Sequence, residues 1–262
     1  MDRIAVYKKV VDVFRVFALL VLLTALNYCF ATTASKKFPM LNVVTEDWPP
    51  HNFLDSHGEI VGTSTKKIKS ILHLANINYN IKLLPWARAF NIAVNKPNTL
   101  IYSIYRIRER ESLFHWFCPL SPVDNLYAYA LKESAVSISS VDELKTHTFA
   151  VSRNEIEHTY LSSLELREGI NLHISAEDET SFDHVLNKKV ELFIETPKAM
   201  ELRLKKRGLP NDFVVSVFKL ELDEMQHCFA ISKGTDPEII KRVSKAFEAV
   251  KNTEEVDMTE VN

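Results

Sequence analysis

The chain has 262 residues, of which 46% are hydrophobic, and its 32 Lys and Arg against 34 Asp and Glu give a net charge of −2. A chain this close to neutral lacks the basic excess typical of nucleic-acid-binding proteins, so we expect no nucleic-acid partner. Its length is sufficient for one large or two small domains with an ample hydrophobic core. With only five glycines in the chain, we find no glycine-rich loop of the phosphate-binding kind.

The first 34 residues are typical of an export signal. Four basic residues, Arg3, Lys8, Lys9 and Arg15, precede an apolar run over 16–26, and small residues follow at 31–35. This order predicts a signal peptide over 1–34, cleaved after Ala34 or Ala31, and hence a periplasmic protein. A membrane anchor is the competing interpretation, but the apolar stretch 16–31 is shorter than the ~20 residues of a spanning helix.

The next segment, up to residue 105, alternates between strand and helix patterns. Strands are predicted at 41–45, 79–84 and 100–105, helices at 63–75 and 85–93, and a short strand at 59–62. Thr63 or Ser64 suits the helix N-cap, and Pro85 suits a first helical turn. The order strand, helix, strand, helix, strand predicts an open sheet with parallel pairing.

A second alternating set follows Pro119. Strands are predicted at 127–131, 148–151, 172–174, 190–194 and 228–232, and helices at 141–144, 155–166, 182–186, 199–206 and 237–250. The chain therefore contains two successive α/β sets, with a last strand and helix after the second.

Three arginines, Arg106, Arg108 and Arg110, follow the strand predicted at 100–105. If the backbone stays extended there, residues two apart share one face. Ligands of α/β folds bind at the carboxyl ends of strands, where a guanidinium can grip a carboxylate with two hydrogen bonds. The competing interpretation is a solvated charge cluster paired with the neighbouring glutamates.

Two cysteines, Cys118 and Cys228, remain after the predicted cleavage. In an oxidising compartment they could pair, but pairing requires Cα atoms within about 7 Å, and the sequence does not give that distance. Two separate buried thiols are equally compatible with the sequence.

Five segments, in their order and spacing, resemble the family 3 extracellular solute-binding proteins, the type II periplasmic binding proteins of amino-acid uptake. The segments are Trp-Pro-Pro at 48–50, Gly-Glu-Ile-Val-Gly at 58–62, Arg-Glu-Ser-Leu-Phe-His-Trp at 110–116, Ser-Val-Asp-Glu-Leu at 140–144 and Ala-Ile-Ser-Lys-Gly-Thr at 230–235. The resemblance covers nearly all of 39–252.

The resemblance implies an α/β fold with two lobes, each an open, mostly parallel sheet flanked by helices, joined by a hinge of two segments. Lobe 1 is expected to contain 35–118 and 226–262, and lobe 2 to contain 119–225. Cys118 and Cys228 would then lie in the two crossing segments, which makes a disulfide between them possible.

In this family an arginine clamps the carboxylate of the ligand, and Arg110 matches it, although Ile107 and Arg108 replace the usual Thr-Pro before it. Glu195 matches the acid that takes the ammonium, where many members carry Asp. Trp48 matches a stacking aromatic. The full set of predicted ligand-binding residues is Arg110, Trp48, Glu195, Glu46, Asp47, Trp86, Arg88, Ser103 and Arg153. For Trp86, a simple core position is the competing interpretation.

The resemblance implies a monomeric periplasmic receptor that captures a small polar ligand, an amino acid or a related carboxylate or zwitterion, and delivers it to the permease of an ABC-type transporter. Two alternatives stay open: a dehydratase-like enzyme using Glu46, Asp47 or Glu195 as acid and base, and a sensing module for a membrane receptor. Because we find no nucleophile elbow and no His/Cys cluster, we predict no catalytic residue, no cofactor and no metal.

Overall fold

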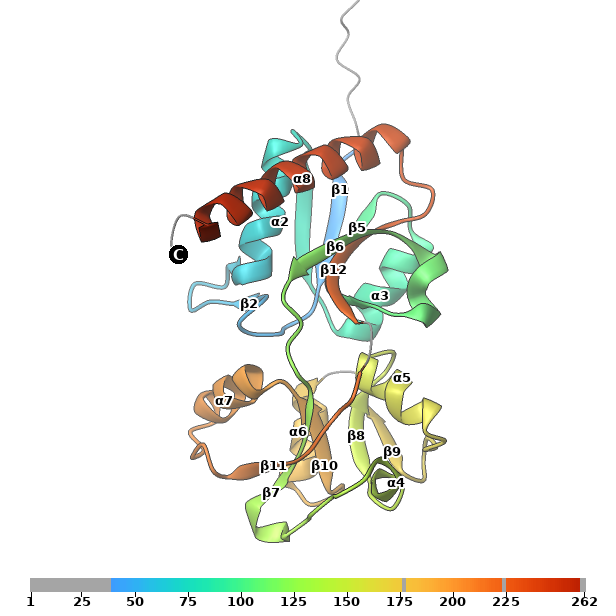
Figure 1. Ribbon diagram of the computed structural model, residues 1–262, viewed down its shortest axis with the longest axis vertical. Coiled ribbons are helices and arrows are strands. Elements are labelled where there is room, and N and C mark those ends of the chain that lie inside the picture. The colour runs from blue at the N-terminus through green and yellow to red at the C-terminus, as the bar shows by residue number, and fades with distance from the viewer. Residues whose placement is uncertain (1–38, 176–177, 223–224, 260–262) are drawn as a thin grey trace, which may run out of the picture. The chain divides into compact units, whose positions relative to one another are not determined.

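The computed structural model describes residues 39–175, 178–222 and 225–259 (Figure 1). The predicted signal peptide and the competing membrane anchor lie outside the described residues. Among the helices that are described, none is both long enough and apolar enough to span a bilayer.

Lobe 1 is the unit built around the first five-stranded sheet, whose strand order is β4-β1-β5-β12-β6. Its strands are β1 (Leu41–Thr45), β4 (Tyr79–Leu83), β5 (Thr99–Arg106), β6 (Phe114–Ser121) and β12 (Gln226–Ser232). β1 pairs in parallel with β4 and β5, whereas β12 pairs antiparallel with β5 and β6. The last strand of the chain therefore returns to the first sheet.

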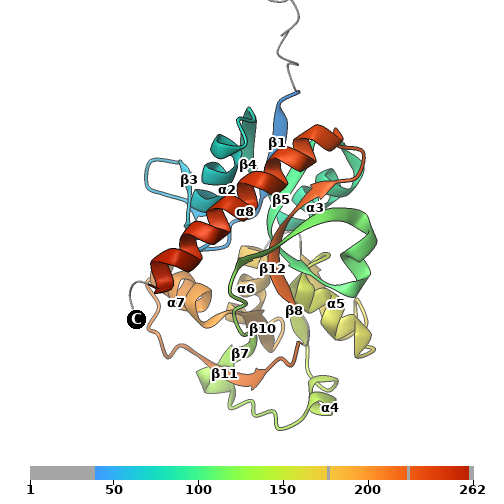
Figure 2. The same ribbon diagram turned by 45° about the horizontal axis from the view of Figure 1, so that its top comes forward.

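Three helices flank this sheet: α2 (Thr63–Leu74), α3 (Trp86–Asn95) and α8 (Pro237–Thr259). Figure 2 shows α8 running beside α2. Between β1 and α2 lies a small hairpin of β2 (Phe53–Leu54) and β3 (Ile60–Val61), and the 3-10 helix η1 (Arg108–Leu113) follows β5.

Lobe 2 is the unit built around the second sheet, whose strand order is β11-β7-β10-β8-β9. Its strands are β7 (Tyr127–Leu131), β8 (Phe149–Ser152), β9 (Leu172–Ser175), β10 (Leu192–Glu195) and β11 (Val214–Lys219). Its helices are α4 (Val141–Leu144), α5 (Ile156–Ser163), α6 (Asp178–Leu186) and α7 (Pro197–Lys206), with a short 3-10 turn η2 (Lys132–Ser134). β8 pairs in parallel with β10 and β9, whereas β7 pairs antiparallel with β10 and β11.

The predicted two-lobed α/β fold is confirmed, with both sheets mixed rather than purely parallel. The sequence analysis missed the edge strands β6 and β11, and β6 contains Pro119, a residue that a sheet tolerates at its edge. α5 ends at Ser163 rather than Leu166, because Glu165 adopts a positive φ of 69°. α8 continues to Thr259, nine residues beyond the predicted end.

Two segments, 122–126 and 220–225, connect the lobes. Cys118 of β6 and Cys228 of β12 form a disulfide with an S–S distance of 2.06 Å and a Cα–Cα distance of 4.7 Å. The bond therefore joins the two strands of lobe 1 that lead into the crossings. The predicted boundary between 118 and 119 falls inside β6, whose pairing with β12 continues to Ser121.

The core of lobe 2 extends across the boundary between the lobes. Trp48 and Tyr105 of lobe 1 are 8% and 6% exposed and belong to the same apolar cluster as Leu126, Ile156 and Ile194. Burial of large aromatic side chains is a strong source of stabilisation. These two aromatics therefore hold lobe 1 against lobe 2 beside the crossings.

Candidate functional site

A small cavity of about 30 Å³, here called the inner cavity, lies between the two lobes. Its lining residues are Glu46, Trp48, Trp86, Ser103, Tyr105, Arg110, Leu126, Glu155, Ile156, Glu157, Ile194 and Glu195. A volume of this size holds about one or two water-sized groups. The inner cavity is therefore lined by four carboxylates and a single guanidinium, with aromatic rings beside them.

The local structure explains why these side chains meet. In lobe 1, Glu46 follows the end of β1, Trp86 begins α3 shortly after β4, and Arg110 lies in η1 after β5. In lobe 2, Glu155 lies between β8 and α5, and Glu195 is the last residue of β10. Because the carboxyl ends of parallel strands lie at one edge of a sheet, each lobe presents its polar residues at that edge.

Arg110 is 4% exposed and is held by backbone groups of both lobes. Its Nη1 donates to the carbonyl oxygen of Tyr105 at 3.2 Å, and its Nη2 donates to that of Asn154 at 2.6 Å. The ring centroids of Trp86 and Phe90 each lie 5.3 Å from the guanidinium carbon. Burial lowers the pKa of the guanidinium from its usual value, and the carboxylates of Glu155 and Glu157 act in the opposite direction.

The carbonyl oxygen of Asn154 accepts a second hydrogen bond from lobe 1. Nε1 of Trp86 donates to it at 2.8 Å. Asn154 has a positive φ of 65°, a conformation that asparagine adopts more readily than most residues. Asn154 lies in the loop between β8 and α5. One backbone oxygen of lobe 2 thus receives two of the donors that the sequence analysis assigned to a ligand-binding set.

Glu195 is a buried carboxylate with a buried cationic partner. Its Oε2 lies 3.0 Å from Nη2 of Arg203, and its Oε1 accepts a hydrogen bond from the backbone N–H of Thr196 at 2.8 Å. Arg203 also contacts Glu179 at 2.9 Å. Burial acts to raise the pKa of Glu179, but the charge of Arg203 and a hydrogen bond from Arg207 hold it below its usual value.

The Tyr105 hydroxyl is buried and makes no hydrogen bond within the described part of the chain. Burial raises the pKa of this hydroxyl well above its usual value, and the charges of Asp124, Glu195, Glu155 and Glu157 raise it further. The Tyr105 ring lies 5.7 Å from that of Trp48 and 5.6 Å from that of His227. The hydroxyl is thus a neutral group available to a ligand in the inner cavity.

Ser103 is buried at the bottom of the site with a positive φ of 58°. Its hydroxyl donates a hydrogen bond to the side-chain oxygen of Asn52. This bond fixes the loop after β1, because Asn52 also donates to the carbonyl of Glu46 at 2.7 Å. Ser103 therefore lines the cavity while its own donor is already used.

A second cavity of about 310 Å³, here called the outer cavity, shares Glu46 and Trp86 with the inner one. Its other lining residues are Asp47, Leu83, Leu84, Pro85, Ser152, Glu179 and Arg203. The volume is in the range of small-molecule sites. Asp47 is exposed, and its carboxylate lies 3.8 Å from Nζ of Lys206.

The structure brings together seven of the nine predicted ligand-binding residues. Six line the inner cavity and Asp47 lines the outer one. Arg88 is exposed on α3, and Arg153 is exposed and paired with Glu168 at 2.9 Å, and neither lines a described cavity. Whether these side chains contact a ligand stays a prediction.

The sequence analysis missed six lining residues: the apolar Leu126, Ile156 and Ile194, and three with polar groups, Tyr105, Glu155 and Glu157. A signal for the two glutamates was present, because they lie at the first turn of a helix that follows a buried strand. That position was interpreted only as a helix start. Tyr105 was assigned to a strand, and the alternation of the strand does not reveal which residue faces a partner lobe.

Arg106, Arg108 and Arg110 do not share one face, because Arg106 ends β5 and the other two lie in the 3-10 helix η1. Arg106 pairs with Glu111, with N–O distances of 2.6 and 2.8 Å, and Arg108 is exposed. Only Arg110 points into the protein. The interpretation as a solvated charge cluster therefore holds for Arg106 and Arg108 but not for Arg110.

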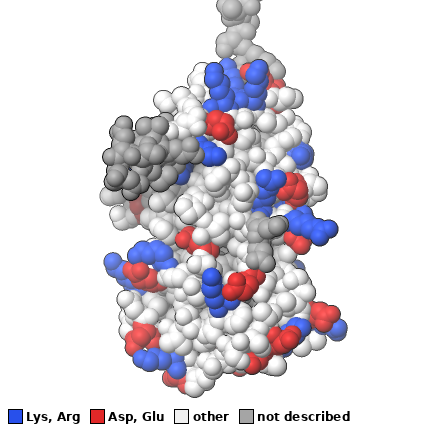
Figure 3. Space-filling view, in the orientation of Figure 1, with Lys and Arg blue, Asp and Glu red and all other residues white. Residues whose placement is uncertain are grey.

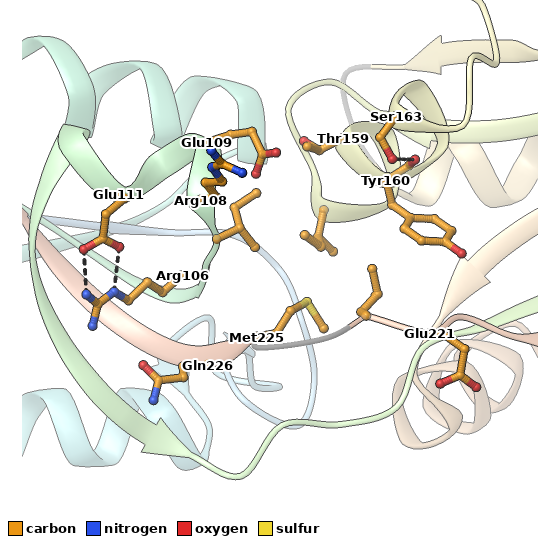
Figure 4. A pocket seen from close by; sticks show the side chains of 13 residues that line it. Arg106, Arg108, Glu109, Glu111, Thr159, Tyr160, Ser163, Glu221, Met225 and Gln226 are labelled. Carbon is orange, nitrogen blue, oxygen red and sulfur yellow. Dashed lines mark hydrogen bonds and ion pairs between the residues drawn. The ribbon is translucent and has the colours of Figure 1, made fainter.

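A larger cavity of about 540 Å³ lies on another side of the lobe boundary, between η1, α5 and the second crossing segment. Figure 4 shows Arg106 joined to Glu111 on one side, with Tyr160 and Ser163 opposite. None of the nine predicted ligand-binding residues lines it.

The charges of the visible surface are mixed. On the face shown in Figure 3, Lys and Arg side chains alternate with Asp and Glu, and neither sign covers a large area. Among the residues that the structure describes, no group of three His, Cys, Asp or Glu side chains is arranged to hold a metal ion.

Comparison with known proteins finds likeness in structure alone. No family model and no curated protein matches the sequence. Among solved structures, an ancestral arginine-binding protein bound to glutamine superposes with a TM-score of 0.70 at 18% identity, over 84% of this chain and 95% of the other. A histidine kinase sensor domain with similarity to periplasmic binding proteins gives a TM-score of 0.70 at 15% identity, over 86% and 95%.

The arginine-, lysine-, histidine-binding protein ArtJ from Geobacillus stearothermophilus gives a TM-score of 0.67 at 16% identity, over 83% of this chain and 91% of the other. At such identities the likeness concerns the fold. The chain has the two-lobed fold of the type II periplasmic binding proteins.

Proposed function

We propose that this chain is a family 3 extracellular solute-binding protein that captures a small ammonium-bearing solute, an amino acid or a related compound, between its lobes. The observation that carries the proposal is the inner cavity, where Trp48, Trp86 and Arg110 of lobe 1 face Glu155, Glu157 and Glu195 of lobe 2. A site with a few convergent polar groups and aromatic walls suits a small polar ligand. The amino-acid-binding structures with the same fold support this choice.

The proposal includes an exported, monomeric receptor with a cleaved signal peptide and delivery to an ABC-type transporter. A ligand that contacts both lobes favours the state in which they are together, by the difference between its affinities for the two states. The two crossing segments at 122–126 and 220–225 suit such a hinge.

The direct test is to identify what the protein carries. The purified protein is denatured, and the released small molecules are identified by mass spectrometry. The protein is then refolded and titrated with them by calorimetry. We expect a released amine or amino acid that rebinds with 1:1 stoichiometry. A refolded protein that binds neither a released compound nor any of a panel of amino acids and amines would contradict the proposal.

A second candidate is a sensing module for a membrane receptor, favoured by the TM-score of 0.70 to a histidine kinase sensor domain. Uptake of the identified ligand distinguishes the two roles. If the protein serves transport, cells that lack it lose uptake of labelled ligand. If it serves sensing, uptake persists, and a ligand-dependent transcriptional response is lost instead.

A further inference from the structure

The size of the inner cavity limits which part of a ligand can enter it. Its volume is about 30 Å³, which holds about one or two water-sized groups. An ammonium group has this size, but an ammonium, a Cα and a carboxylate together do not fit. The 310 Å³ outer cavity, which shares Glu46 and Trp86 with it, has room for the rest of a small molecule.

The charge of the inner cavity favours a cation. Four carboxylates line it, those of Glu46, Glu155, Glu157 and Glu195, against two guanidinium groups: that of Arg110, which also lines it, and that of Arg203, which pairs with Glu195 at 3.0 Å. Three of these carboxylates are at most 9% exposed, so they are poorly screened by solvent. An entering ammonium is attracted by this excess of negative charge, and an entering carboxylate is repelled.

The N-terminus of helix α5 in lobe 2, where an anion could bind, already carries two acidic residues. Helix α5 begins next to the cavity, and a helix N-terminus favours negative charge. Glu155 occupies its N-cap position and Glu157 its first turn. A ligand carboxylate placed there would lie beside two carboxylates of the protein.

The guanidinium of Arg110 is already bound by the protein itself. The Asn154 carbonyl oxygen accepts a hydrogen bond from Arg110 at 2.6 Å and another from Trp86 at 2.8 Å. It therefore occupies the position in which an oxygen of a ligand carboxylate would accept these two hydrogen bonds. The rings of Trp86 and Phe90, whose centroids lie 5.6 Å apart, pack beside the guanidinium on one side. A ligand carboxylate can accept from Nη2 in the position of the Asn154 carbonyl only by displacing the loop at Asn154.

An independent observation indicates a ligand group in the cavity. Tyr105 lines it, is 6% exposed, and its hydroxyl is the one buried tyrosine oxygen without a hydrogen-bond partner within the described residues. A buried hydroxyl without a partner is costly, and an ammonium donor would satisfy it. An ammonium offers three donors, which the Tyr105 oxygen and neighbouring carboxylates can accept.

We propose that the site selects small linear amines with a cationic group at each end, and that a carboxylate on the ligand is not needed. One ammonium enters the inner cavity against Tyr105 and the glutamates. The second cationic group lies in the outer cavity, beside Glu46 and Asp47 and away from Arg203, which lines the same cavity and pairs with Glu179. The carbonyl of Asn154 occupies Arg110 in place of a ligand carboxylate. This inference rests on the proposed function and narrows its ligand class.

Calorimetric titration with matched pairs tests the inference, because each pair differs only by the carboxylate: lysine and cadaverine, ornithine and putrescine, arginine and agmatine. We expect the amine of at least one pair to bind as tightly as its amino acid or more tightly. If every amino acid that binds does so more than threefold tighter than its amine, the inference is wrong, and the proposed function stands. If no member of any pair binds, the inference is wrong, and the released-solute experiment decides separately on the proposed function.

Two substitutions locate the bound ammonium. Tyr105→Phe should weaken binding of the preferred amine about tenfold, while the fold is retained because the hydroxyl has no partner to lose. Glu157→Gln should weaken it at least as much. The matched controls are Tyr160→Phe, a half-buried tyrosine outside both cavities, and Glu109→Gln, an exposed glutamate. The placement of the ammonium in the inner cavity would be wrong if Tyr105→Phe and Glu157→Gln leave the affinity for the amine unchanged. It would also be wrong if the two controls lower that affinity equally.

Discussion

The carbonyl oxygen of Asn154 lies 2.6 Å from Nη2 of Arg110, so a backbone group of lobe 2 binds the buried guanidinium of lobe 1. The same oxygen lies 2.8 Å from Nε1 of Trp86. These contacts join the lobes at the site where a ligand is proposed to bind. The state described here is therefore held together partly by the protein itself.

Replacing Arg110 should weaken this contact between the lobes. In Arg110→Gln, two carbonyl groups lose hydrogen bonds from a charged donor, so we expect the free energy of unfolding to fall by about 3 kcal/mol. We also expect the radius of gyration measured by small-angle scattering to rise, because the lobes separate more readily. Arg108→Gln, at an exposed position two residues away, is the matched control and should change neither quantity.

The same variant separates two roles for Arg110. If it clamps a ligand carboxylate, as the family resemblance predicts, Arg110→Gln should weaken amino acids far more than their decarboxylated amines. If it holds the loop at Asn154, both members of each pair should weaken by the same factor. The ratio of the two dissociation constants, measured in wild type and variant, distinguishes these outcomes without depending on overall stability.

Removing the hydroxyl of Tyr105 should change stability and affinity in opposite directions. The hydroxyl is buried without a partner among the described residues, so Tyr105→Phe should raise the free energy of unfolding of the ligand-free protein by up to about 1 kcal/mol. Ligand affinity should fall, as argued above. Urea unfolding of ligand-free wild type and variant measures the first effect. A clear loss of stability would show that the hydroxyl has a partner in the folded protein.

The disulfide should contribute a large part of the stability of lobe 1. Cys118 and Cys228 are 110 residues apart in the chain, and closing a loop of that length is expected to stabilise by about 4 to 5 kcal/mol in the chain-entropy model. The variant with both cysteines replaced by alanine should therefore have a lower melting temperature in the absence of reductant. Reductant should lower the melting temperature of wild type and leave that of the variant unchanged, and equal sensitivity of both would contradict the prediction.

Buried His227 should make the protein less stable as pH falls. Burial lowers its pKa to about 3, the charges of His51 and Lys67 act in the same direction, and Asp124 opposes them. Above about pH 6.5 the side chain is neutral in both the folded and the unfolded chain, so it contributes no slope. Between pH 6.5 and 3 only the unfolded chain takes up the proton, so the free energy of unfolding falls by up to about 1.4 kcal/mol per pH unit.

Urea titrations at pH 7, 6 and 5 measure this slope before most carboxylates titrate. His227→Gln should flatten the decline over this range. His57→Gln, at an exposed histidine, is the matched control and should keep the slope of the wild type. Identical slopes in wild type and His227→Gln would contradict the assignment of the decline to this side chain.

Breaking the buried pair of Glu195 and Arg203 should be costly. Both side chains are 5% exposed and their atoms lie 3.0 Å apart, so Arg203→Met leaves the carboxylate buried without this cation. We expect a loss of about 3 to 5 kcal/mol, measured by urea unfolding. Lys206→Met, on the same helix but exposed, should have little effect. A loss below 1 kcal/mol in Arg203→Met would mean that solvent or another group compensates the carboxylate.

The sequence by itself determined most of the strands and helices and the order in which they occur. The strand at 41–45 was predicted residue for residue, because a short apolar run ended by two prolines has few alternatives. The five segments that resemble the solute-binding family, and so predicted the two-lobed fold, are also short local patterns in the sequence. Edge strands such as β6 were missed, since half-exposed strands lack a clear apolar pattern.

Only the tertiary structure decided which polar residues meet across the lobes. Arg110 was selected from the sequence, but its partner, the carbonyl of Asn154, carries no side-chain signature, because every residue has that group. Glu155 and Glu157 lie 45 or more residues from Arg110 in the chain, and no local pattern records such a distance. The acidic character of the cavity arises from packing two lobes together, whereas local propensities act within a few residues along one segment.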